Sequence, residues 1–132
     1  MLQDIWILYK SGIVVFHRDY KESLSPQAFG AMMSALDTFA EHLTEGGLSN
    51  FELNNKRYTI IKKHDLIFVA NSSKQYNQKK INRELEKVSN KFLKLYSKDL
   101  EGYKGKIGSF TEFEEVIEKS LEYNNNKPSG DL

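Results

Sequence analysis

The chain of 132 residues has no cysteine, only two prolines and no long apolar run. Without cysteine it can form neither a disulfide bond nor a thiolate metal site, which is compatible with a reducing compartment. A membrane-spanning helix needs ~20 apolar residues, and the apolar run near the N-terminus, Ile5 to Tyr9, is far shorter and follows no basic segment. We therefore expect a cytoplasmic protein without a signal peptide or a membrane span.

Net charge of one sign is also almost absent, because 19 basic side chains are balanced by 18 acidic ones and the formal charge is +1. This balance provides too little long-range attraction for a nucleic-acid partner. The hydrophobic fraction of 39% is that of a globular protein, and the length suits one domain. We expect a single domain over residues 1–123 and a disordered polar tail over residues 124–132.

The chain does contain several short segments whose residue patterns predict β-strands. Residues 51–71 predict an antiparallel meander of three strands joined by tight turns. Two segments, Ile5 to Tyr9 and Leu66 to Ala70, are apolar at successive positions, which is typical of strands covered on both faces. These two strands should therefore lie inside the sheet, with the strands at residues 13–18 and 48–53 at its edges.

The first helix is predicted to begin at Ser25-Pro26, where serine can cap and proline suits the first helical position, and to end before Gly46-Gly47. Its apolar residues recur at steps of three and four, which predicts one stripe facing the core. The stripe consists of Phe29, Met32, Met33, Leu36, Phe39, Ala40 and Leu43. We interpret its two methionines as core-filling side chains.

Two further helices follow the meander. The second should end near Lys98, and the third should begin at a capping box formed by Ser109 and Glu112. The core positions predicted for the second helix are Ile81, Leu85, Val88, Phe92 and Leu95. Those predicted for the third are Phe110, Phe113, Val116, Ile117 and Leu121.

The predicted element order is ββαβββαα, and three segments carry a family resemblance. Residues 5–20 (IWILYKSGIVVFHRDY) are similar to the start of clathrin-adaptor small chains. Residues 51–73 resemble the block of strands three to five in the longin or SNARE-like fold, and residues 103–113 resemble the glycine-bearing link into its last helix. The resemblance implies an α+β fold: a five-stranded antiparallel sheet in the order 2-1-5-4-3, with one helix on one face and two on the other.

For function, the resemblance implies a non-enzymatic protein-interaction module in membrane-trafficking or small-GTPase regulatory complexes. Its partners would be Ras-like GTPases, other longin-type or roadblock-type subunits, or a second copy in a homodimer. Two alternatives stay open: a roadblock-like GTPase regulator, and a profilin-like or PAS-like domain that senses a small ligand. Bulky residues at the inferred core positions favour a filled interior over a ligand cavity. They are Trp6, Phe16, Phe29, Phe39, Phe68 and Phe92.

Residue patterns typical of catalysis or metal binding are missing from the sequence. The three histidines, His17, His42 and His64, do not lie at the spacing of metal ligands, and no cysteine can complete a site. We expect no enzymatic activity, no metal and no cofactor.

One candidate surface is the short edge strand of the meander, where unpaired backbone groups could accept a strand from a partner. The residues assigned to this edge are Asn50, Phe51 and Leu53.

The second candidate surface is electrostatic, because residues 56–106 carry 14 basic and 5 acidic side chains. At 100° per residue, six cations of the second helix fall within about 80° of one another. They are Lys80, Arg83, Lys87, Lys91, Lys94 and Lys98. Such a strip is either a solvated helix flank or a docking strip for an acidic partner or an anionic membrane, which would place the protein peripherally on membranes.

Overall fold

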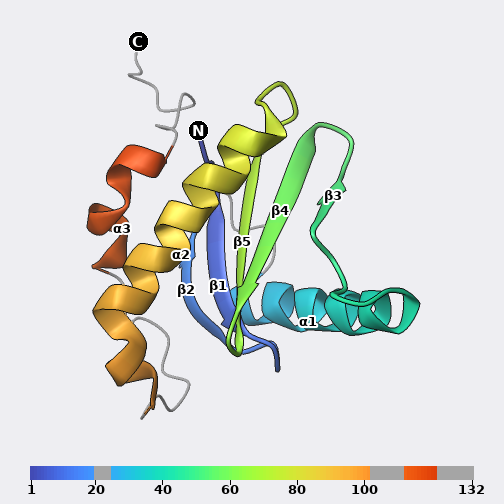
Figure 1. Cartoon of the computed structure of the whole chain (residues 1–132), viewed down its shortest axis with the longest axis horizontal. Coiled ribbons are helices and arrows are strands. Elements are labelled where there is room, and N and C mark those ends of the chain that lie inside the picture. The colour runs from blue at the N-terminus through green and yellow to red at the C-terminus, as the bar shows by residue number, and fades with distance from the viewer. Residues whose placement is uncertain (20–24, 102–111, 122–132) are drawn as a thin grey trace.

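The computed structural model describes residues 1–19, 25–101 and 112–121, and these form an α+β fold around one five-stranded antiparallel sheet (Figure 1). The strand order is β2-β1-β5-β4-β3, as predicted, and the predicted element order is also confirmed. The strands are β1 (Ile5–Tyr9), β2 (Val14–Arg18), β3 (Asn50–Glu52), β4 (Lys56–Lys63) and β5 (Leu66–Ser73). The helices are α1 (Pro26–Leu43), α2 (Gln78–Glu101), α3 (Phe113–Val116) and the 3-10 turn η1 (Glu118–Ser120).

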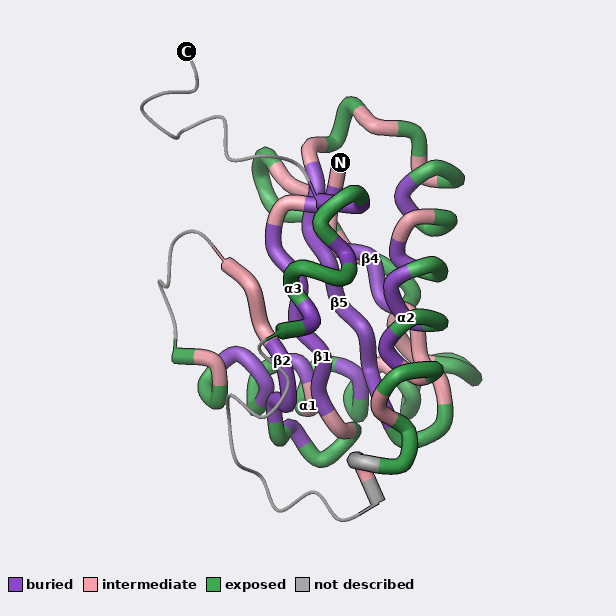
Figure 2. Tube along the Cα trace, turned by 90° about the vertical axis from the view of Figure 1, so that its left-hand side faces the viewer, coloured by how far each residue is buried: buried purple, intermediate pink, exposed green. Residues whose placement is uncertain are grey.

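The two strands with continuous apolar runs lie inside the sheet, as the sequence predicted. Ile7 of β1 is opposite Phe16 of β2 on one side and opposite Phe68 of β5 on the other. Successive strand residues point to opposite faces. The runs therefore supply two separate cores: Ile7 and Phe68 pack beneath α2, whereas Trp6 and Val69 pack with residues of α1. Figure 2 shows the buried residues concentrated along these two strands.

The N-terminal half of α1 is fixed to the β1–β2 hairpin. Its helix cap is the predicted one, because the Ala28 amide donates to Ser25 Oγ at 3.1 Å and Pro26 opens the helix. Gln27 brackets the backbone of Val14, donating to its carbonyl and accepting from its amide. Gly30 allows close approach, since a Cβ there would collide with the Gly12 carbonyl oxygen. This half of the helix is therefore positioned by backbone contacts as well as by apolar packing.

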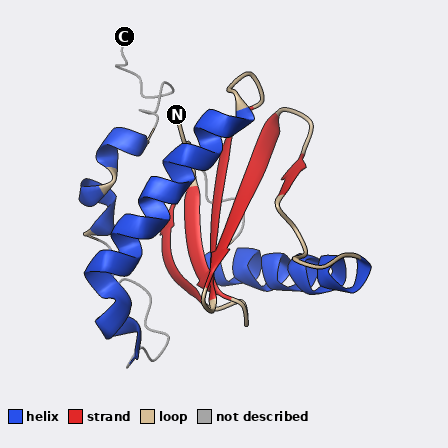
Figure 3. Ribbon diagram, in the orientation of Figure 1, coloured by secondary structure: helices blue, strands red, loops and turns tan. Residues whose placement is uncertain are grey.

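Helix α2 crosses the opposite face of the sheet and ends at Glu101, beyond the predicted end near Lys98 (Figure 3). Four of its five predicted core residues are fully buried: Ile81, Leu85, Val88 and Phe92. The fifth prediction is wrong, because Leu95 is 50% exposed. In that last third of α2 the aromatic rings of Phe92 and Tyr96 fill the space against Phe113.

The third helix is shorter than predicted and completes the core above β1 and β2. Phe113, Ile117 and Leu121 are buried as predicted, whereas Val116 is 40% exposed. The Leu2 amide donates to the Ser120 carbonyl at 3.2 Å, which joins the two ends of the described chain. Ser109 and Phe110 of the predicted helix start, and the predicted tail at residues 124–132, lie outside the described residues.

Candidate interaction surface

The outward side of α1 carries a row of apolar side chains that the sequence assigned to the core. Of the predicted stripe, Phe29 and Met33 are buried, at 6% and 0% exposure. The prediction is wrong for the remaining large side chains: Met32 and Leu36 are 39% exposed, Phe39 is 66% and Leu43 is 72%. The stripe thus comprises two adjacent faces, about 100° apart around the helix, and the sheet covers one of them. The interpretation of both methionines as core residues holds for Met33 alone.

A buried ion pair explains why the C-terminal half of α1 turns its apolar row outward. Asp37 is 4% exposed and occupies the face toward the sheet, where its Oδ1 lies 2.5 Å from Lys62 Nζ of β4. The same oxygen accepts a hydrogen bond from the Leu48 amide at 3.2 Å. This carboxylate occupies the inward face of the helix one turn after Met33. The apolar row that contains Leu36 and Phe39 is therefore left on the solvent side.

The outward face of α1 is free of charge. Placed at 100° per residue, the row of Met32, Leu36, Phe39 and Leu43 is flanked by alanines 28 and 35, which are also exposed. The acidic residues of the helix, Asp37 and Glu41, lie on its other side. A helix face that stays in water is ordinarily polar, whereas an exposed, uncharged apolar row is typical of interaction surfaces.

The edge strand β3 lies on the side of the sheet toward which the C-terminal half of α1 extends (Figure 1). The Leu53 amide donates to the Lys56 carbonyl at 2.9 Å, and Ser49 accepts from the Ile60 amide at 2.9 Å. Because backbone direction alternates along an antiparallel strand, the backbone groups of Asn50 and Glu52 point away from β4. These are the groups that a further strand could pair with.

The three residues predicted for the edge differ in their surroundings. Asn50 is exposed at the start of β3, and Phe51 is half-buried, with its ring stacked on Tyr58 at 4.8 Å. Leu53 is 53% exposed but lies just after the strand, which ends at Glu52. Phe51 therefore anchors the strand to the sheet, while Asn50 and Glu52 form the free edge.

Stacked aromatic rings connect this edge with α1 across the sheet. Phe29 of α1 stacks on Trp6 at 4.0 Å between ring centroids, Trp6 lies 6.2 Å from Tyr58, and Tyr58 stacks on Phe51. Stacked ring pairs of this kind stabilise the packing of α1 and β4 against the sheet beyond the area that they bury. The outward row of α1 and the edge strand are thereby held in a fixed relation, and together we call them the α1–β3 face.

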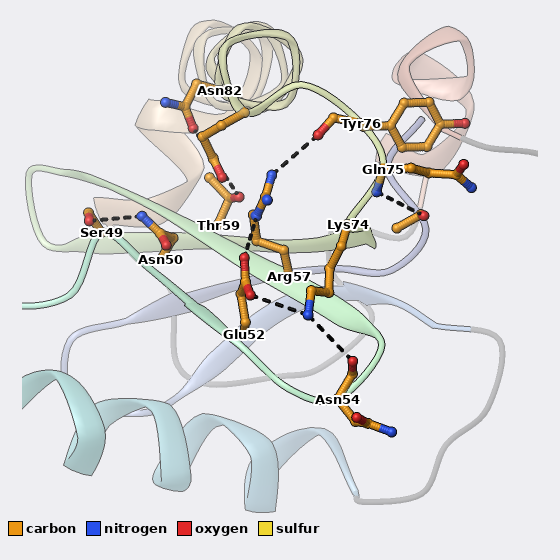
Figure 4. A network of polar contacts seen from close by, with 12 residues as sticks. Ser49, Asn50, Glu52, Asn54, Arg57, Thr59, Lys74, Gln75, Tyr76 and Asn82 are labelled. Carbon is orange, nitrogen blue, oxygen red and sulfur yellow. Dashed lines mark hydrogen bonds and ion pairs between the residues drawn. The ribbon is translucent and has the colours of Figure 1, made fainter.

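Polar contacts also fix β3 (Figure 4). Glu52 Oε2 lies 3.2 Å from Arg57 Nε, and Glu52 Oε1 lies 3.4 Å from Lys74 Nζ. Arg57 also donates a hydrogen bond to the Tyr76 carbonyl. The hydrogen bond from Arg57, followed by that from Lys74, lowers the pKa of the Glu52 carboxyl below its ordinary value. The short strand is therefore tied to β4 and to the loop before α2 by an ionised carboxylate.

The six cations of the predicted basic strip are all exposed on α2, on the face of the sheet opposite to α1. Among the side chains that the structure describes, which leave out those of residues 99 and 101, the one member with an anionic group inside 4 Å is Lys87, which pairs with Glu84 at 3.4 Å. Glu86, the residue before Lys87, pairs instead with Lys63 of β4, whose Nζ lies 2.6 Å from Glu86 Oε2. The structure thus keeps the two candidate surfaces apart, one on each side of the sheet.

Other polar groups form contacts within the fold. His17 Nδ1 lies 2.8 Å from Asp19 Oδ1, and His42 Nδ1 lies 2.8 Å from the Thr38 carbonyl oxygen. Among the residues that the structure describes, no group of three or more histidine, aspartate or glutamate side chains is placed to hold a metal ion. In that same part of the chain, none of the helices is both long and apolar enough to cross a bilayer.

Comparison with known proteins finds one family and several solved structures that resemble this chain. The model of the family described as "First Longin domain of FUZ, MON1 and HPS1" matches residues 3–120. No curated protein matches the sequence significantly. Among solved structures, Myxococcus xanthus MglB aligns with a TM-score of 0.59 and 12% identity, over 74% of this chain and 85% of that one. A Roadblock/LC7 domain from Streptomyces avermitilis gives the same score and identity, over 73% and 86%. At this identity the two structures show a shared fold.

Proposed function

Because this chain belongs to the family of the first longin domain of FUZ, MON1 and HPS1, we propose that it is a non-enzymatic interaction module working through the α1–β3 face. The observation that carries the proposal is the uncharged apolar row on α1 beside a free sheet edge. In the part of the chain that the structure describes, eight large apolar side chains are exposed, and five of them belong to this region. They are Met32, Leu36, Phe39, Leu43 and Leu53.

The occupant that this face fits best is a second copy of the chain. Two-fold association requires a surface that is complementary to itself, and an uncharged apolar row meets its own copy without repulsion. Two β3 strands can pair in antiparallel fashion across the same axis, using the outward backbone groups of Asn50 and Glu52. The two α1 rows would then cover each other and remove their apolar area from water.

The pair would serve as a platform in a membrane-trafficking or small-GTPase regulatory complex, with a Ras-like GTPase as the recruited partner. The family membership and the roadblock-type fold of the structural neighbours support this role. A profilin-like or PAS-like sensor is the alternative. Except for Phe39, the bulky residues that indicated a filled interior are indeed buried, at 6% exposure or less.

The association is tested by sedimentation velocity over a range of protein concentrations. We expect the wild type to dimerise and the double variant Leu36→Glu/Phe39→Glu to be monomeric with unchanged circular dichroism, since both positions are exposed. Val116→Glu is the matched control, because Val116 is 40% exposed and Leu36 is 39%. It should dimerise like the wild type. A wild type that stays monomeric at all concentrations would contradict the proposal.

The strand edge is tested separately by a proline. Asn50→Pro removes an outward amide at the first residue of the strand, where proline is tolerated, so dimerisation should weaken while the monomer stays folded. Phe51→Pro instead removes an amide that bonds to β4 and should destabilise the monomer itself.

The wider role is tested by whether the wild type retains a purified Ras-like GTPase. If the protein is a strict monomer and binds a small metabolite, the sensor alternative would be favoured.

A further inference from the structure

The outward face of α2 is a straight line of cations. Lys80, Arg83, Lys87, Lys91, Lys94 and Lys98 are all exposed, and from first to last they span about 27 Å at 1.5 Å per residue. The inward face of the same helix is anchored by Ile81, Leu85, Val88 and Phe92, which are fully buried. The cations are therefore presented on a rigid support.

Most of these charges have no counterion among the side chains that the structure describes. Among the described side chains, the ion pairs of lysine and arginine involve five cations of the strands and of the loop after β5, besides Lys87 of the strip: Arg18, Arg57, Lys62, Lys63 and Lys74. Closely spaced like charges repel one another. Keeping five of them exposed and unpaired on one helix face has a cost that an anionic ligand would remove.

The chemistry of the strip favours a fluid anionic surface over a specific anionic site. Five of the six cations are lysines, which act as flexible point charges, whereas arginine is the residue suited to bidentate recognition of a fixed group. An α-helix is a cylinder, so one side of it can lie along a flat surface. Leu95, between Lys91 and Lys98, is 50% exposed, and an apolar side chain among lysines is typical of helices at a lipid interface.

We propose that this strip docks the protein onto anionic phospholipid membranes, with the axis of α2 parallel to the bilayer. Because α1 lies on the other face of the sheet, the α1–β3 face stays accessible to a partner while the membrane is bound. Each cation near an anionic bilayer strengthens binding about five-fold, which corresponds to about 1 kcal/mol. The basic strip thus holds the protein on the membrane, while the α1–β3 face contacts another protein chain.

The test is co-sedimentation of the purified full chain with vesicles of phosphatidylcholine alone or with about 30% phosphatidylserine, at low and high salt. The wild type should bind the phosphatidylserine vesicles, and binding should fall as salt screens the charges. Lys91→Glu/Lys94→Glu should reduce binding by at least about 25-fold, because two favourable charges become unfavourable. The melting temperature should barely change, since exposed unpaired lysines contribute little to stability.

The matched control is Lys10→Glu/Lys119→Glu, which makes the same change in net charge at exposed positions outside α2. It should bind phosphatidylserine vesicles nearly as well as the wild type. Equal loss in both double variants would overturn the proposal, because net charge rather than the strip would then govern binding. It would also be overturned if the wild type ignored lipid charge but bound an acidic polypeptide such as polyglutamate. The monomeric variant Leu36→Glu/Phe39→Glu should still bind vesicles, so failure of dimerisation and failure of membrane docking are distinguishable.

Discussion

Helices α1 and α2 cover opposite faces of the same sheet, yet their outward sides have opposite character. The outward side of α2 carries six exposed cations and that of α1 carries four exposed large apolar side chains. Both helices have an inward apolar face at the usual helical spacing. The difference therefore lies in what each helix presents to solvent, and it separates the surface that we propose for a protein partner from the one that we propose for an anionic membrane.

Two phenylalanines give the sharpest version of this comparison. Phe92 of α2 is fully buried against Phe68 and Phe113, whereas Phe39 of α1 is 66% exposed. Phe92→Ala should lower the free energy of unfolding by about 3–5 kcal/mol, because it leaves a cavity between the rings of Phe68, Tyr96 and Phe113. Phe39→Ala should change it by less than about 0.5 kcal/mol in the monomer. Urea denaturation of both variants measures the difference, and similar losses would place Phe39 in the core.

The ion pair beneath α1 should have an intermediate effect. Asp37→Ala removes the nearer of the two carboxylates beside Lys62, whose side chain is 17% exposed, and it removes the acceptor of the Leu48 amide. We expect a loss of about 1–3 kcal/mol, because the Leu48 amide loses its acceptor and Lys62 keeps only the Gly46 carbonyl and the more exposed Glu41 carboxylate. Asp37→Asn keeps an acceptor for the Leu48 amide and should lose less. Equal stability of the alanine variant and the wild type in urea would show that the pair does not hold α1 in place.

The smallest effect concerns pH at the β3 edge. The pKa of the Glu52 carboxyl in the folded chain lies below its ordinary value of 4.5, chiefly because Arg57 donates a hydrogen bond to it. The carboxylate therefore contributes stability above pH 4.5, and this contribution is lost as the pH falls through the folded pKa. Unfolding measured against pH should show a small difference between the wild type and Glu52→Gln at neutral pH that closes in acid. A difference that grows in acid would contradict the assigned contact.

The sheet and one of the two surfaces could be predicted from the sequence. Continuous apolar runs located β1 and β5 inside the sheet, because a strand covered on both faces needs apolar residues at every position. The helical spacing of lysines and one arginine was enough to locate an exposed strip, since charged residues on a helix with a separate apolar face remain in water.

The α1 row could not be predicted in the same way, because apolar periodicity does not show which of two adjacent helix faces meets the sheet. Two signals were present: an aspartate at position 37, one turn after Met33, and the lack of charged residues beside Met32 and Leu36. The direction of the backbone groups of Asn50 also needed the strand register, because a shift of one residue reverses it.

The central claim is that two copies meet through the α1–β3 face, and single-cysteine cross-linking tests it most directly. The natural chain has no cysteine, so Leu36→Cys and the control Val116→Cys each carry one thiol at a position of similar exposure. Packed helices lie about 8–10 Å apart, which a short thiol-specific cross-linker can span. We predict a covalent dimer for Leu36→Cys and little or none for Val116→Cys. Equal cross-linking of the two variants, or none in Leu36→Cys under conditions where the protein sediments as a dimer, would contradict the account.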